Sequence, residues 1–154
     1  MKIFIMRHGE AEHFAASDAE RALTERGIRE SIAIAQSCHQ KGVTGFDKVL
    51  VSPYLRAQQT WQQIQPIFPE STFDICHDIT PYGQADLVFD YVSALVDVEQ
   101  LQSLLLVSHL PLVGYLTSEF LTDLPPPIFP TSGMIGIEFD PVTRRSELLW
   151  QLYP

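Results

Sequence analysis

Three short apolar runs, each cut off by polar residues, constrain the fold of this chain more than any other feature of its sequence. The runs have the length and the β-branched content of buried strands. They are Lys2 to Met6, followed by Arg7-His8; Lys48 to Val51, followed by Ser52; and Leu104 to Val107, followed by Ser108-His109. Because the carboxyl ends of parallel strands lie along one edge of a sheet, these polar side chains are expected to converge at that edge.

Segments with helical spacing of apolar residues separate the runs. Thr24 is a good N-cap for a first helix, which closes at Lys41-Gly42. Its apolar face is expected to carry Ile28, Ile32 and Ala35. Three more helices are predicted. The first has Ser52 as N-cap and Pro53 as its first residue. The second covers Gln84 to Asp97, with Val88, Tyr91 and Leu95 on one face, and the third runs from Pro111 to the prolines Pro125 to Pro127.

The remaining strands complete an α/β pattern. Thr72 to Cys76 is predicted as a weaker strand, and Met134 to Phe139 forms a closing hairpin with Glu147 to Leu152 through Asp140-Pro141. Strands that alternate with helices in this way favour a three-layer α/β/α sandwich with a mostly parallel central sheet. We expect residues 1–154 to form a single domain, because this length and 45% apolar residues suffice for one core.

Charge and cysteine content limit the partners. A net charge of -9 repels nucleic acid and anionic membranes, so neither is an expected partner. The apolar run at the N-terminus is too short for a signal sequence or a membrane span. Cys38 and Cys76 have neither metal-ligand nor C-x-x-C spacing, and the default interpretation is two reduced thiols. We therefore expect a cytoplasmic protein, and we also expect a monomer.

The polar residues that follow the strands suit the transfer of a phosphoryl group. His8 offers a nucleophilic imidazole beside the Arg7 guanidinium, and Gly9 lets the backbone approach an anion. An arginine and a histidine that satisfy loop carbonyls would give the same triplet, but further residues favour a phosphate site. They are Arg56 near a helix N-terminus, Arg21 before Leu23-Thr24, and His109 as a second imidazole.

Four ordered motifs resemble the histidine phosphatase superfamily, also called the phosphoglycerate mutase-like family, over nearly the whole chain. They are R-H-G-E at Arg7 to Glu10, L-T-x-x-G at Leu23 to Gly27, S-P-x-x-R-A-x-x-T at Ser52 to Thr60, and S-H-x-P at Ser108 to Pro111. The short chain, Ala15 to Asp18 ahead of Arg21, and H-L-P-L-V-G-Y-L from His109 are similar to the bacterial SixA phosphohistidine phosphatases.

The resemblance implies a fold and a reaction. The fold is phosphoglycerate mutase-like, and His8 is the nucleophile that becomes a covalent phosphohistidine. Arg7 and Arg56 match the phosphate clamps, His109 the second histidine, and Arg21 the additional arginine of the SixA-like branch. The implied substrate is the phosphorylated histidine-containing phosphotransfer (HPt) domain of a sensor kinase, and the product is inorganic phosphate. We expect neither a cofactor nor a metal, since the guanidiniums balance the developing charge.

One departure from the superfamily bears on the substrate. Members that cleave phosphate esters place a glutamate after the third strand, whereas Thr80 to Gln84 contains no carboxylate. An alcohol leaving group needs an acid, but an imidazole does not, so this departure favours a P–N substrate. Glu10 or Asp18 remains an alternative proton donor, and His13 is a less favoured catalytic candidate. Two other hypotheses stay open: a phosphomonoesterase for small phosphate esters, and a non-catalytic phosphate-binding module.

Overall fold

The computed structural model describes residues 1–154 and contains one six-stranded sheet with the order β3-β2-β4-β1-β5-β6. The strands are β1 (Lys2–Arg7), β2 (Lys48–Val51), β3 (Phe73–Ile75), β4 (Ser103–Ser108), β5 (Met134–Phe139) and β6 (Ser146–Leu152). β1 pairs in parallel with β4, β4 with β2 and β2 with β3. β5 pairs antiparallel with β1, and β6 pairs antiparallel with β5. The expected mostly parallel sheet with a closing hairpin is confirmed.

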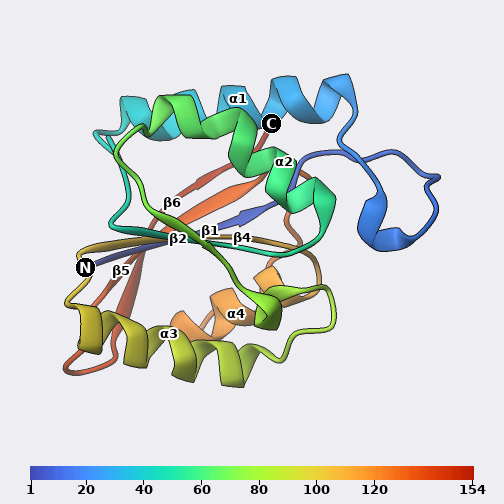
Figure 1. The fold of residues 1–154 in the computed structure, drawn as a ribbon. Coiled ribbons are helices and arrows are strands. Elements are labelled where there is room, and N and C mark those ends of the chain that lie inside the picture. The colour runs from blue at the N-terminus through green and yellow to red at the C-terminus, as the bar shows by residue number, and fades with distance from the viewer.

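Four helices cover the two faces of this sheet. They are α1 (Glu25–Gln40), α2 (Leu55–Ile64), α3 (Ala85–Glu99) and α4 (Leu112–Phe120), with 3-10 turns at Asp18–Glu20, Gln65–Ile67 and His77–Ile79. α1 and α2 lie on one face, and α3 and α4 lie on the other (Figure 1). The prediction of a three-layer α/β/α sandwich is confirmed. None of the helices combines the length and the apolar character that crossing a membrane requires.

The core is divided between the two faces of the sheet. Successive side chains of β1 alternate between them: Ile3 and Ile5 belong to the cluster under α3 and α4, and Phe4 and Met6 to the cluster under α1 and α2. All four are buried, as expected for a central strand covered on both faces. This packing makes β1 a rigid support for the residues that follow it.

Two predicted helix ends were wrong. α2 begins at Leu55, with Tyr54 as its N-cap, rather than at Pro53 after a Ser52 cap. The Ser52 hydroxyl instead accepts a hydrogen bond from the Tyr54 N–H, which turns the chain before the helix starts. α4 ends at Phe120, well before the prolines. The proline run folds back along α4. The approach is so close that a Cβ on Gly114 would lie 2.6 Å from the carbonyl oxygen of Pro127.

Two predicted helix faces also differ from the structure. Tyr91 was expected in the core of α3 but is 43% exposed. In α1, Ile28 and Ile32 are only partly buried. The buried face of α1 consists of Gly27, Ser31, Ile34, Ala35 and Cys38. At the start of this face, small residues at Gly27 and Ser31 let α1 pack closely on the segment that carries Gly9 and Glu10.

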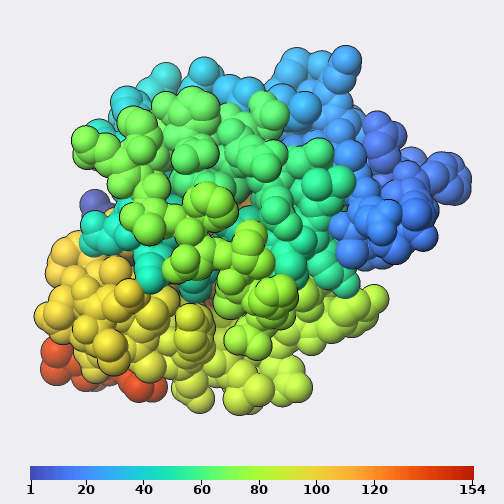
Figure 2. All heavy atoms as spheres, in the orientation of Figure 1, coloured from blue at the N-terminus to red at the C-terminus, as the bar shows by residue number.

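The segment between β1 and α1 projects from the body of the molecule. Figure 2 shows it as a separate blue lobe at the right of the view, beside the carboxyl ends of the strands in Figure 1. Its base is tied down by an isolated antiparallel bridge between Ala11 and Leu23. The lobe therefore forms one side of the region into which β1 and β4 lead.

Candidate active site

The five residues singled out from the sequence line one cavity of about 310 Å³. They are Arg7, His8, Arg21, Arg56 and His109. β1 delivers Arg7 and His8, and β4 delivers His109, because the parallel register pairs Arg7 with Ser108. The His8 and His109 ring centroids are 5.0 Å apart. The expected convergence at one sheet edge is present in the structure.

The hydrogen bonds of His8 define its neutral tautomer. The Nδ1 atom lies 2.7 Å from the carbonyl oxygen of Gly9, which can only accept, so Nδ1 carries the proton. The Nε atom of Arg56 donates to Nε2 at 3.2 Å, so Nε2 carries the lone pair. The nitrogen available as a nucleophile is therefore Nε2.

Burial keeps this imidazole neutral. His8 is 6% exposed. Burial and, to a smaller extent, the Arg56 charge lower the pKa of His8 to about 3, against the opposing effect of the hydrogen bond to Gly9. The Gly9 N–H donates to Thr60 Oγ1 at 3.0 Å, and that hydroxyl donates to the Arg56 carbonyl at 2.8 Å. These bonds fix the peptide that orients His8. The low pKa keeps the ring uncharged at neutral pH.

Arg56 lies in the first turn of α2 and is 3% exposed. Besides its contact with His8, it donates from Nη1 to the Asp18 carbonyl at 2.7 Å and from Nη2 to the Asp18 carboxylate at 3.2 Å. Its guanidinium carbon also lies 5.1 Å from the Tyr54 ring centroid. These contacts hold the guanidinium in one orientation beside the nucleophile.

Asp18 joins two of the arginines. The Arg21 Nε atom donates to its carboxylate at 2.9 Å, and Arg21 Nη1 donates to the Glu12 carbonyl at 2.9 Å. Burial alone would raise the pKa of Asp18, but the hydrogen bonds from Arg21 and Arg56 outweigh it and lower the pKa. Asp18 is therefore ionised and orders two cationic side chains of the cavity.

Arg7 adds a third guanidinium. It donates from Nη1 to the Phe129 carbonyl at 2.8 Å, while its buried Nε atom has no partner. Burial lowers the pKa of Arg7, and the nearby Arg56 charge contributes to the lowering. Guanidiniums gathered at one cavity favour the binding of an anion such as phosphate.

His109 supplies the second imidazole. It is 1% exposed, and its Nε2 atom lies 2.7 Å from Ser52 Oγ, whereas its Nδ1 atom has no partner. Burial, with a smaller contribution from the Arg56 charge, lowers the pKa of His109 to about 2. Both histidines of the cavity are therefore neutral at physiological pH.

The alternative proton donors are held by other partners. Glu10 lines the cavity, but its carboxylate accepts from Thr24 Oγ1 at 3.0 Å and lies 3.7 Å from Arg26. The Asp18 carboxylate is occupied by the two arginines. Asp78 lines a different hollow together with Tyr82. His13 lines the cavity with an exposed side chain, whereas His39 and His77 lie outside it.

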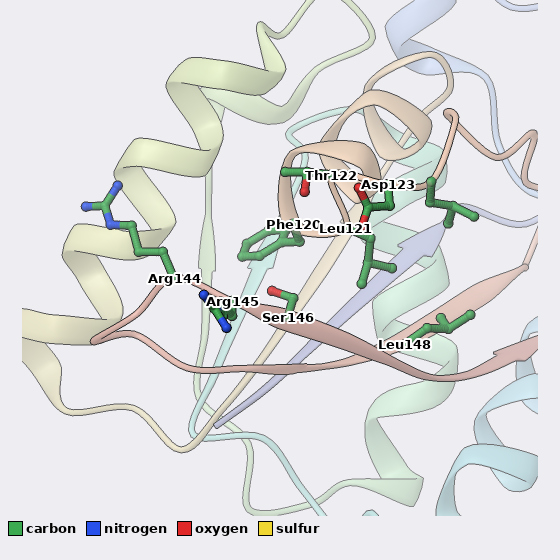
Figure 3. A pocket seen from close by; sticks show the side chains of 9 residues that line it. Phe120, Leu121, Thr122, Asp123, Arg144, Arg145, Ser146 and Leu148 are labelled. Atoms are coloured by element: carbon green, nitrogen blue, oxygen red, sulfur yellow. The ribbon is translucent and has the colours of Figure 1, made fainter.

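A larger hollow of about 490 Å³ lies at the far end of α4 from His109 (Figure 3). It is formed by residues 120–124 and the start of β6, where Arg145 and Ser146 lie near Phe120. The Arg144 side chain turns toward α3, and its guanidinium carbon lies 6.0 Å from the Phe89 ring. No histidine lines this hollow, and it is separate from the site around His8.

Three residues matter more to the cavity than the sequence indicated. The sequence indicates Asp18 as an alternative proton donor and Ser52 as a helix cap, and it indicates Thr60 only as part of a motif. The spacing of Asp18 and Arg21, three residues apart, was the one available signal for an ion pair. Groups of three or more potential metal ligands among His, Cys, Asp and Glu are absent from the structure, so no metal ligands can be named.

Comparison with known sequences finds similarity to histidine phosphatases. The model of the histidine phosphatase superfamily (branch 1) matches residues 3–72. A phosphohistidine phosphatase SixA homolog of Haemophilus influenzae is 42% identical over 97% of this chain and 88% of its own length. The phosphohistidine phosphatase SixA of Escherichia coli is 39% identical over 100% of this chain and 94% of its own.

Solved structures agree with the sequence comparison. The protein histidine phosphatase SixA complexed with tungstate has a TM-score of 0.93 and 39% identity, covering 100% of this chain and 97% of the other. A phosphoserine phosphatase of Entamoeba histolytica has a TM-score of 0.74 at 17% identity, over 99% of this chain and 97% of its own, and shows the fold alone. The predicted phosphoglycerate mutase-like fold is confirmed.

Proposed function

Because this chain belongs to the histidine phosphatase superfamily and, within it, to the SixA phosphohistidine phosphatases, we propose that it removes phosphate from a phosphohistidine of another protein. The observation that carries this proposal is the state of His8. Its imidazole is neutral with the lone pair on Nε2, and it lines the cavity together with three guanidiniums. A neutral nucleophile surrounded by cations is suited to attack a phosphorus atom that bears negative oxygens.

In the first step, His8 Nε2 attacks phosphorus, and the P–N bond to the substrate histidine breaks. The bonding electrons return to the substrate nitrogen, and a ring that is protonated on its other nitrogen leaves as neutral imidazole. His8 then carries the phosphoryl group on Nε2 and a proton on Nδ1, so its ring is cationic. The Gly9 carbonyl, 2.7 Å from Nδ1, stabilises that charge.

In the second step, water attacks the phosphorus of the phosphorylated His8. The P–N bond breaks and its electrons return to Nε2. His8 thereby regains the neutral tautomer with its proton on Nδ1. Both water protons remain on the product, which leaves as dihydrogen phosphate. Arg7, Arg21 and Arg56 stabilise the negative oxygens in both steps without a metal.

The substrate class follows from the leaving group. An alkoxide would need a proton, typically worth about 10²–10⁴-fold in rate, and the carboxylates of Glu10 and Asp18 are already held by other side chains. An imidazole leaves without that help. We infer that phosphohistidine is hydrolysed faster than any alkyl phosphate.

The partner that we propose is the HPt domain of a sensor kinase, which makes the reaction a step of a phosphorelay. The names of the relatives support a phosphohistidine substrate, and the HPt domain is our choice among proteins that carry one. We further propose that the protein acts as a monomer, in the cytoplasm, where the free thiols of Cys38 and Cys76 would stay reduced. Elution volume in gel filtration tests the monomer.

The proposal is tested by measuring kcat/KM on three substrates in one buffer that contains EDTA. These are an HPt domain phosphorylated on histidine, p-nitrophenyl phosphate and a sugar phosphate. We expect the HPt domain to be the best substrate and the sugar phosphate the poorest, with p-nitrophenyl phosphate between them because its leaving group also departs without protonation. A sugar phosphate turned over as well as the HPt domain would instead support a small-molecule phosphomonoesterase, and loss of activity in EDTA would contradict metal independence.

A further inference from the structure

Ser52 occupies a position that a helix cap would not explain. Its side chain is fully buried at the end of β2, outside α2. The Ser52 oxygen has two hydrogen-bond partners, the Tyr54 N–H at 3.3 Å and the His109 Nε2 atom at 2.7 Å. Its shortest contact is thus with an active-site imidazole.

The direction of the bond between Ser52 and His109 follows from counting donors and acceptors. The Tyr54 N–H can only donate, so the hydroxyl oxygen accepts that bond. The hydroxyl proton then has one acceptor within reach, which is the lone pair of His109 Nε2. If Nε2 carried a proton, the buried hydroxyl proton of Ser52 would have no acceptor, and structures avoid such groups.

We propose that Ser52 is a positioning residue that holds His109 in the tautomer with its proton on Nδ1, so that Nδ1–H becomes a donor to the phosphoryl group. The Nδ1 atom is buried and has no partner within the protein. His109 also lines the cavity that contains His8. A donor without a partner at an anion site is available to a phosphoryl oxygen.

The two histidines would then present opposite groups to one substrate. His8 offers a lone pair to phosphorus, whereas His109 offers a proton to one of the oxygens. The opposite tautomer of His109 would direct a lone pair at negatively charged oxygens and repel them. The charged and aromatic groups near His109 are His8, Arg56, Arg7, Asp18 and Tyr54. Since burial lowers the pKa of His109 to about 2, the neutral tautomers are the forms that compete.

The tautomer is measurable on the free protein. With ¹⁵N-labelled histidine, NMR of the wild type should show a protonated Nδ1 and an unprotonated Nε2 for His109. The Ser52→Ala variant should lose this preference, because the loss of one such hydrogen bond changes the ratio of the two His109 tautomers about tenfold. A wild-type spectrum with a protonated Nε2 would overturn the proposal. This readout needs no substrate, so it stands apart from the proposed phosphohistidine substrate on which the role of the donor rests.

The position of the donor can be tested at His109 itself. The amide nitrogen of asparagine can occupy the place of Nδ1, and that of glutamine can occupy the place of Nε2. His109→Asn should therefore bind tungstate more tightly than His109→Gln and keep more of the kcat for the phosphorylated HPt domain. Equal loss in the two variants, or a better glutamine variant, would contradict a donor at Nδ1.

A double-mutant cycle separates positioning from a general structural role. Ser52→Ala should weaken tungstate binding about tenfold in the wild type but have little further effect in His109→Ala, because the two residues act as one unit. Ser93→Ala is the matched control, since it removes a buried hydroxyl without a partner and should bind tungstate normally. An equal loss from Ser52→Ala in both backgrounds would show that Ser52 does not act through His109.

Discussion

Replacing Arg56 by lysine keeps the positive charge beside His8 but removes the planar set of donors. The guanidinium contacts His8 Nε2 at 3.2 Å, the Asp18 carbonyl at 2.7 Å and the Asp18 carboxylate at 3.2 Å. A lysine has one nitrogen on a flexible stem and cannot make these contacts together. The substitution therefore tests fixed geometry separately from charge.

The expected loss follows from the number of fixed donors. Removing one preorganised donor from a transition state costs about 10²–10³ in kcat, or about 2.7–4 kcal/mol. Arg56 is 3% exposed, so solvent cannot replace the lost contacts. We expect kcat/KM of Arg56→Lys on the phosphorylated HPt domain to fall within that range, and tungstate binding to weaken as well.

The assay needs a control for the exchange of arginine by lysine. Arg26 is suitable because its side chain is 66% exposed, pairs with Glu30 and Glu10, and does not line the cavity. Arg26→Lys should leave kcat/KM within about twofold of wild type, as expected for a surface pair. An Arg56→Lys variant that folds normally and stays within about threefold of wild type would refute the argument that fixed donors, rather than charge alone, carry the rate.

Two further predictions concern stability. A Cβ on Gly27 would lie 2.2 Å from the Glu10 carbonyl oxygen. Gly27→Ala should thus lower the free energy of unfolding in urea by about 2 kcal/mol or more. The control Gly45→Ala, whose Cβ would meet Ser71 Oγ at 3.6 Å, should stay close to wild type, and equal stability of both variants would contradict the predicted clash. The lowered pKa values of His8 and His109, about 3 and about 2, predict that acid destabilises the fold. Below pH about 6.5 the unfolded chain protonates both rings while the native state does not, so the free energy of unfolding should fall between pH 6.5 and 5, by at most about 1.4 kcal/mol per pH unit for each ring. His109→Asn should reduce this slope, and an unchanged slope would argue against a neutral buried His109.

The sequence was sufficient to predict the sheet and the residues at its edge. Buried strands are recognisable as apolar runs, and their order along the chain brought His8 and His109 to one cavity. The contacts that orient these residues were not predictable, because they join segments that are distant in sequence. Asp18 reaches Arg56 across 38 positions, and Ser52 reaches His109 across 57.

Local patterns failed where tertiary packing chose otherwise. Ser52-Pro53 has the composition of a helix start, yet the hydroxyl is used by His109 and α2 begins at Leu55. The buried face of α1 is set by the close approach of Gly27 to Glu10 rather than by the largest apolar side chains. In α3, Tyr91 has the spacing of a core residue but lies toward solvent.

The central claim is that the phosphoryl group passes through His8, and trapping the intermediate tests it most directly. The protein is mixed with an HPt domain that carries ³²P on its histidine, the reaction is stopped in alkali within milliseconds, and the labelled peptide is identified by mass spectrometry. We predict an alkali-stable, acid-labile phosphate on His8 of the wild type and none on the His8→Ala variant, which should keep its fold. Turnover by His8→Ala near the wild-type rate would contradict the account, as would label on a residue of this protein other than His8.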